Sequence, residues 1–136
     1  KGTLRTFDAA TRSRLHERIV AVAEASCALA RCSLEHEWIT GTPAVVNDAE
    51  SVERFRKVAA RVVGPDNVTV QAPIMGGDDM ALWLAQARGC YFFVGTSSDA
   101  DTSWAHHHPR FDIDERGLEV AVTVLASGVA DLMIGD

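Results

Sequence analysis

The sequence predicts an α/β fold, and two observations carry this prediction. Apolar stretches with the alternation or the all-apolar composition of strands occur at residues 2–7, 32–40, 67–71 and 90–94. Between them lie longer segments whose apolar residues recur three and four positions apart, which is the period of a helix. Strands that alternate with helices are typical of α/β proteins. The 136 residues, 47% of them hydrophobic, are enough for a packed core.

The first predicted unit is a strand, a helix and a second strand. Residues 2–7 read as a short strand, and Asp8 follows as a helix N-cap. The helix runs to about residue 29, and residues 32–40 then alternate as a half-buried strand does. One face of the helix is expected to be covered, through residues at helical spacing: Leu15, Ile19, Val22, Ser26 and Leu29.

The next segment is predicted to hold two helices and a short strand. A helix begins near Asn47 or Asp48, where Asn47 and Glu50 have the spacing of a capping box, and ends at Gly64, which precedes a proline. Residues 67–71 form a short strand. A glycine loop then opens a helix over residues 80–87.

The last segment pairs a buried strand with an apolar helix. Residues 90–94 are apolar on both faces, as a central strand covered by helices is. Asp112 and Glu115 have capping-box spacing, and residues 118–134 form a helix that is apolar on almost every side. Such a helix must be buried against a sheet. Because few predicted strands are available to it, we expect further sheet from residues outside this sequence.

Composition and charge limit the classes of partner. Lys and Arg total 13 against 19 Asp and Glu, a net charge of -6, and no basic cluster is interleaved with aromatic residues, so a nucleic-acid partner is excluded. The three cysteines match no Cys-x-x-Cys motif, which favours a reducing compartment without a disulfide framework. No signal-peptide core or long apolar run is evident, so we expect a cytoplasmic location and no membrane span. The missing initiator Met suggests part of a longer protein.

Three consecutive histidines, residues 106–108, are the most distinctive feature and are closed by Pro109. Neutral imidazole is a common metal ligand, and the proline restricts the backbone before it, so this segment is a candidate metal-ligand loop. A solvated histidine cluster is the alternative. Neighbouring side chains point to opposite sides, so one ligand from this loop is the realistic expectation. His16 reads as solvated and His36 as packed beside Trp38. The chain alone therefore does not make a metal centre.

The glycine loop and one arginine are the candidate substrate contacts. In residues 75–79, two glycines permit close approach and two aspartates can cap the next helix, so a purely structural role competes with a cleft-lining role. Arg5 carries a permanent cation whose fork suits a carboxylate, although a surface arginine is the commoner case. Cys90 begins an apolar strand and reads as an inert core thiol.

Taken in order, six segments resemble the C-terminal part of amidohydrolases of the hippurate hydrolase and N-acyl-amino-acid deacylase type, within the two-metal aminoacylase and carboxypeptidase family. The resemblance implies the C-terminal half of a phosphorylase/hydrolase-like three-layer catalytic domain at residues 41–136. Residues 1–40 would be the second half of an α+β lid, or dimerisation, domain. The six segments are residues 2–8, 41–43, 46–48, 75–79, 91–95 and 107–112.

The resemblance also implies roles for individual residues. His107 matches the metal ligand of the family's His-x-Pro loop, with the register among residues 106–108 left slightly open because His106 takes a place that is usually apolar. Arg5 matches the arginine that reaches a substrate carboxylate, and Gly41 would lie near the same cleft. Met75, Gly76 and Gly77 would line it, although related enzymes have Glu-Asp-Phe where this chain has residues 78–80, Asp-Asp-Met.

The implied activity is hydrolysis of the amide bond of N-acyl amino acids, hippurate-like substrates or related amides and peptides. In that family two divalent ions, zinc or else manganese, cobalt or nickel, polarise the amide carbonyl and bind a water that a glutamate deprotonates. The family's other metal ligands and its glutamate base lie upstream of these residues. We therefore expect the isolated chain to be inactive, and the full protein to be a homodimer through its lid.

Two alternatives remain open. One is a naturally short, noncatalytic binding or assembly module derived from such an enzyme. The other is an unrelated metal-carrying α/β protein, in which all three histidines of residues 106–108 would bind metal within this chain alone.

Overall fold

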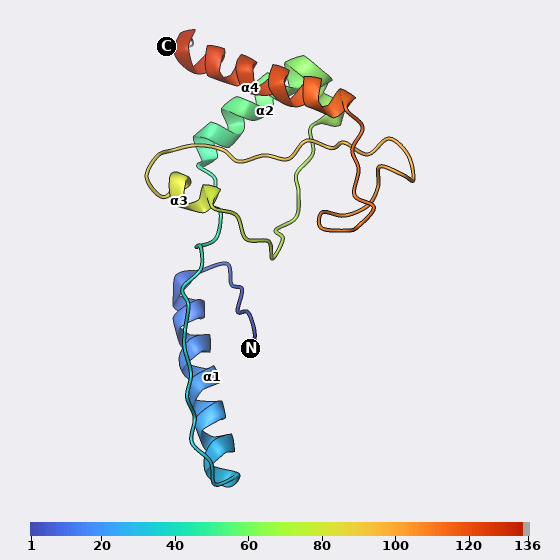
Figure 1. Cartoon of the computed structure of the whole chain (residues 1–136). Coiled ribbons are helices and arrows are strands. Elements are labelled where there is room, and N and C mark those ends of the chain that lie inside the picture. Colours follow the sequence, from blue (N-terminus) through green and yellow to red (C-terminus); the bar gives the residue numbers. More distant parts are fainter. Residues whose placement is uncertain (135–136) are drawn as a thin grey trace. The chain divides into compact units, whose positions relative to one another are not determined.

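The computed structural model describes residues 1–134, and the regular elements of this range are helices. They are α1 (Ala9–Leu29), α2 (Ala49–Val63), the short 3-10 helix η1 (Pro65–Asn67), α3 (Met80–Leu84) and α4 (Arg116–Ile134) (Figure 1). The chain divides into two compact units. The first contains Lys1–Val46 and Ala72–Ala87, and the second contains Asn47–Gln71 and the residues from Arg88 onward.

The predicted strands are the main difference between sequence and structure. Residues 2–7, 32–40, 67–71 and 90–94 have no β-ladder within the described range, 1–134. An extended segment becomes a strand only when a neighbouring strand takes up its backbone hydrogen bonds, and these four segments find no such neighbour there. The strand assignments are therefore wrong for this structure, and the three-layer sandwich stays a prediction.

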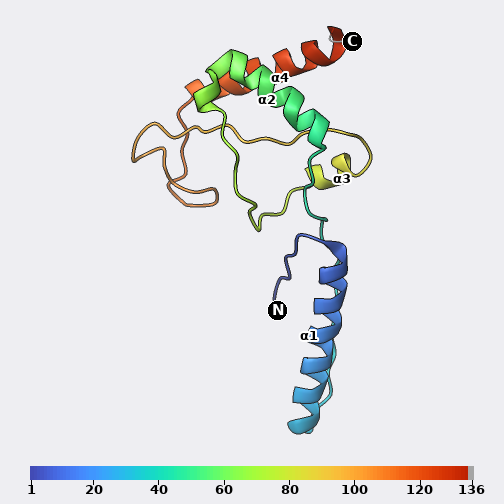
Figure 2. The ribbon, with the colours of Figure 1, turned by 180° about the vertical axis from the view of Figure 1, so that it is seen from behind.

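Helix α1 dominates the first unit. It begins where predicted, because the Asp8 side chain accepts a hydrogen bond of 2.7 Å from the Thr11 backbone N–H. That bond is the largest of the effects that lower the pKa of Asp8. The chain of residues 32–46 then runs back along α1, as both ribbon views show (Figures 1 and 2).

The covered face of α1 is not the predicted one. The ring of His16 stacks on Trp38 at 3.9 Å between centroids, and Arg12, one turn earlier, contacts the same returning segment. The predicted apolar stripe stays open, with Val22 52% exposed and Leu29 88% exposed. The returning segment thus lies beside the stripe, on the polar and aromatic residues of the neighbouring face.

Helix α2 is capped at both ends. Asp48 Oδ1 accepts from the Ser51 N–H at 2.9 Å and from the Ser51 hydroxyl at 2.8 Å, which lowers the pKa of Asp48. Gly64, with φ of 85°, ends the helix as predicted. Asn47 has another role: its amide donates to the Tyr91 carbonyl and accepts from the Tyr91 N–H, both at 2.8 Å. A side chain thus makes the pair of bonds that a neighbouring strand would make.

Helices α3 and α4 also differ from their predicted bounds. Helix α3 stops at Leu84 instead of residue 87. Helix α4 starts at Arg116, and Asp114 rather than Asp112 accepts from its first N–H, at 3.0 Å. Hydrogen bonds from the side chain and backbone of Arg116 hold the pKa of Asp114 well below its usual range.

The second unit is held together by packing of α2 against α4 (Figure 1). Val58 of α2 is fully buried and Val124 of α4 is 4% exposed. Gly128 of α4 lies against the ring of Phe55, which also contacts Phe92 at 5.8 Å between centroids. At the far end Asp131 of α4 accepts from Arg61 at 2.7 Å, an exposed pair that contributes little to stability.

The opposite side of α4 is open, contrary to the prediction that this helix, apolar on almost every side, is buried against a sheet. One stripe of this side consists of exposed apolar residues: Leu118, Val122, Leu125, Val129 and Leu132. Within the second unit α2 packs against one face of the helix, and Thr96 lies against Gly117 near its start. By length and composition α4 could also cross a membrane, a test that the core helix of a globular protein passes equally.

The division into residues 1–40 and 41–136 stays a prediction, because compactness alone does not assign either unit to a domain of the family. Residues 135 and 136, at the end of the second range, lie outside the described residues.

The contact between Gly128 and Phe55 yields a stability prediction. A Cβ at residue 128 would lie 2.3 Å from Phe55 Cε1, so Gly128→Ala forces the ring out of its packing and should cost about 1–3 kcal/mol of unfolding free energy. Thermal denaturation measures this loss. Gly95→Ala is the matched control, because a Cβ there meets nothing within 4 Å. If Phe55→Leu does not relieve the cost of Gly128→Ala, the proposed clash is wrong.

Candidate functional site

Three segments of the first unit converge on Gly77. A Cβ built on Gly77 would lie 3.1 Å from Nη1 of Arg5 and 3.8 Å from Oγ1 of Thr42. Arg5 comes from the residues before α1, Thr42 from the returning segment and Gly77 from the loop before α3. A side chain at residue 77 would crowd the guanidinium and force it to shift away from the loop backbone.

The guanidinium of Arg5 is exposed, and no carboxylate in residues 1–134 pairs with it. An unpaired fork of N–H donors, beside a hydroxyl and a bare glycine backbone, suits a small ligand that carries a carboxylate. The arrangement can therefore bind and orient an anion. It contains no nucleophile or general base at this position.

The other predicted substrate contacts lie near this cluster along the chain. Gly41 precedes Thr42, is exposed, and has nothing within 4 Å of an added Cβ. Met75 is 53% exposed. Gly76 is less confined than Gly77, since its added Cβ would meet only the Ile74 side chain, at 3.5 Å. Of the two loop glycines, Gly77 is the one whose lack of a side chain matters to Arg5.

Arg12 supports the cluster, and the sequence did not point to it. Its Nη2 donates to the Thr42 carbonyl at 2.9 Å, which ties α1 to the residue beside Gly41. Its Nε is buried without a hydrogen-bond partner in the described chain. On the sequence Arg12 reads as a solvated residue of the polar face. The available signal was its helical spacing from His16, which lies one turn later on the same covered face.

The histidine loop lies in the second unit, and its three rings have different surroundings. The ring of His108 stacks on Trp104 at 4.1 Å, and its Nδ1 accepts from the Arg110 N–H at 3.1 Å. Arg110 also lies over the Trp104 ring at 4.5 Å. The ring of His106 meets Phe111 edge to face at 5.1 Å. Two of the three histidines are thus engaged in local packing.

His107 differs from both neighbours. It is exposed and has φ of 67°, a left-handed conformation that is uncommon for a residue with a side chain and that clusters at functional sites. In the described part of the chain no hydrogen bond or ring contact involves its side chain. The imidazole of His107 is therefore free to take a ligand.

The described residues do not complete a metal centre. No group of three His, Cys, Asp or Glu side chains gathers among residues 1–134. His16 and His36 lie 6.4 Å apart between ring centroids in the first unit, with the His16 ring taken up by Trp38. As a single exposed imidazole, His107 fits a metal ion as one ligand of a larger set.

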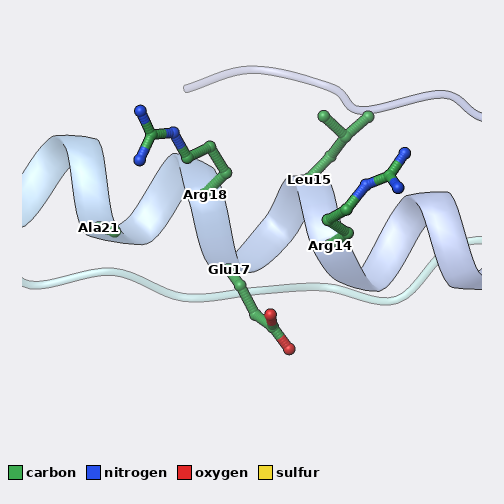
Figure 3. A pocket seen from close by; sticks show the side chains of 5 residues that line it. All are labelled: Arg14, Leu15, Glu17, Arg18 and Ala21. Carbon is green, nitrogen blue, oxygen red and sulfur yellow. The ribbon is translucent and has the colours of Figure 1, made fainter.

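An open hollow on the outer side of α1 is not part of these sites. Its lining includes Leu15 with the stems of Arg14 and Arg18, while the Glu17 side chain points the other way (Figure 3). It contains no group suited to acid, base or nucleophilic chemistry beyond Glu17, which is exposed.

Comparison with known proteins gives the family. The model of "Peptidase family M20/M25/M40" matches residues 8–131. The putative amidohydrolase YhaA of Bacillus subtilis is 36% identical over 126 residues, which cover 92% of this chain and 32% of the relative. The N-acetyl-L-cysteine deacetylase of the same organism is 34% identical over 122 residues, 87% of this chain and 27% of the relative. Thermostable carboxypeptidase 1 of Saccharolobus solfataricus is 25% identical over 122 residues, which cover 88% of this chain and 30% of the relative.

These matches are to proteins named as peptidases and amidohydrolases. More narrowly, the chain belongs to peptidase family M20/M25/M40. The family resemblance predicted from six segments is thereby confirmed, and an α/β hydrolase-type fold fits this membership. The chain spans about a third of the length of the curated relatives it matches. No solved structure matches it.

The two loop glycines allow a matched test of the Arg5 cluster in the complete enzyme. Gly77→Ala should raise KM several-fold, because the new Cβ pushes against the Arg5 guanidinium at 3.1 Å. Gly76→Ala should leave KM nearly unchanged, since its Cβ makes only an ordinary contact. Steady-state kinetics of both variants decides the matter, and equal KM values would contradict the arrangement.

Proposed function

We propose that this chain is the C-terminal portion of a metal-dependent amidohydrolase that cleaves the amide bond of N-acyl amino acids, hippurate-like substrates, or related amides or peptides. The observation that carries the proposal is the exposed guanidinium of Arg5, which has no carboxylate partner among residues 1–134 and lies beside Thr42 and Gly77. The printed names of the relatives agree with amide hydrolysis, since they include an amidohydrolase, a deacetylase of N-acetyl-L-cysteine and a carboxypeptidase.

The substrates of these named reactions explain why the site needs a cation. Hydrolysis of an N-acyl amino acid or of a C-terminal peptide bond acts on a substrate whose far end is a carboxylate. A fork of two N–H donors binds such a group in a fixed orientation, which holds the amide at a constant distance from the reacting groups. Arg5 fits this role, with Gly41, Met75, Gly76 and Gly77 as its surroundings.

In this proposal His107 contributes one ligand to a pair of divalent ions, zinc or else manganese, cobalt or nickel. Its free imidazole and the engaged rings of His106 and His108 support the choice of register. Bound metal would supply polarisation of the amide carbonyl. The remaining ligands and the base come from residues outside this chain, so the chain alone would be inactive. A cytoplasmic location and a homodimer formed through the lid complete the proposal.

The ligand register is tested by metal analysis of the complete enzyme. His107→Ala should lose about one equivalent of metal and most activity, because its position in the coordination shell falls vacant. His106→Ala and His108→Ala are the controls, and both should retain metal. Equal loss in all three variants would contradict the assignment.

The role of Arg5 is tested by substrate charge. Arg5→Ala should raise KM for an N-acyl amino acid by about ten- to a hundredfold with a smaller change in kcat, because a charged ground-state contact is lost. A substrate whose carboxylate is replaced by a carboxamide should show little difference between wild type and variant. Arg18→Ala, which removes another exposed cation of the first unit, is the matched control (Figure 3). An unchanged KM in Arg5→Ala would reject the role.

A further inference from the structure

The C-terminal turn of α1 brings two cysteines together. Arg31 adopts a left-handed conformation with φ of 55°, and its N–H donates to the Ala28 carbonyl at 3.2 Å. The Cys32 N–H then donates to the Cys27 carbonyl at 2.9 Å. Counted from Cys27, one bond runs from the sixth residue to the first and the other from the fifth to the second. These two hydrogen bonds define a Schellman motif.

The motif places the side chains of its first and last residues against each other, and that contact is usually hydrophobic. Here both positions are cysteines. The Cys32 thiol donates to the Cys27 carbonyl at 3.5 Å, and both cysteines are free thiols. The hydrogen bond between the two thiols, followed by partial burial, raises the pKa of Cys27. The backbone hydrogen bond of 2.9 Å between these two residues holds them next to each other, and closeness of the two residues is the first requirement of a disulfide.

We propose that Cys27 and Cys32 form a redox-active dithiol that low-molecular-weight disulfides oxidise to an intramolecular disulfide at the end of α1. The proposal is independent of the amidohydrolase activity. It concerns a modification site at the C-terminal end of α1.

Exposure and acidity set the order of the two steps. Cys32 is exposed, whereas Cys27 is half-buried and its pKa is raised, so the Cys32 thiolate attacks first. This attack forms a mixed disulfide on Cys32 and releases one small thiolate. The Cys27 thiolate then attacks Cys32 Sγ, forms the intramolecular bond and releases the second small thiolate. The protein loses two protons and two electrons, and the small disulfide is reduced to two thiols.

The third cysteine provides the contrast. Cys90 lies in the second unit, where burial raises the pKa of its thiol, and its only recorded hydrogen bond goes to the adjacent Tyr91 carbonyl. Cys90 is the one cysteine of the second unit, so that unit supplies no second thiol as a resolving partner. The sequence has three cysteines. Oxidation should therefore remove the free thiols of Cys27 and Cys32 together and leave the thiol of Cys90.

Glutathione disulfide is the probe for the experiment, with intact-mass spectrometry, alkylation of remaining thiols and peptide mapping as the readout. The wild-type protein should lose two hydrogen atoms, show a Cys27 to Cys32 linkage and recover both thiols with a reducing agent. Cys90→Ser should behave in the same way. Cys27→Ser should instead stop at a mixed disulfide on Cys32.

Several results would overturn the proposal. These are a mixed disulfide that persists on wild-type Cys32, a linkage to Cys90, a bond between two chains, or no loss of thiols. Because the wild-type linkage map is decisive by itself, poor folding of a variant does not obscure the outcome.

Discussion

Backbone hydrogen bonding is the constraint on which the rest of this structure depends. A helix satisfies its N–H and C=O groups within its own segment, whereas a strand needs a neighbour. The described chain accordingly keeps its helices and lacks the sheet that its sequence predicts. The consequence is little burial: in the described chain the buried hydrophobic residues are Ala81 in the first unit and Val58 and Val124 in the second. Where a neighbour is missing, a side chain can replace it, as Asn47 does for Tyr91.

Local signals were sufficient to predict the helices. The residues at the helix ends, Asp8, Asp48 and Gly64, contact residues three or four positions away. Their effect can therefore be predicted from the sequence. The strands and the burial of α4 depend on partners far along the chain or outside it, which periodicity does not identify. Arg12 shows the same limit within the first unit. Its partner Thr42 lies thirty positions away, so its spacing alone reads as a solvated cation.

The sequence predicted some parts of the candidate site and not others, because several of its contacts join residues far apart in the chain. From the residues alone, Arg5 and the loop of Gly77 competed with commoner structural roles, and Gly41 was named only through the family resemblance. The structure adds that Gly77 and Thr42 lie beside the guanidinium of Arg5. For the histidine loop the sequence left the ligand register open. The ring contacts of His106 and His108 favour His107, because packing occupies its neighbours and leaves its imidazole free. Neither the sequence nor the structure of this chain identifies the other metal ligands that would act with His107.

The intact mass of the protein in freshly lysed source cells tests most directly whether these residues serve a larger metal-dependent amidohydrolase. We expect a mass well above 14.7 kDa, with amide-hydrolysing activity in the same fraction. A mass near 14.7 kDa would contradict the proposal, because one histidine and one arginine do not assemble a two-metal centre. The function would then be that of a noncatalytic binding or assembly module.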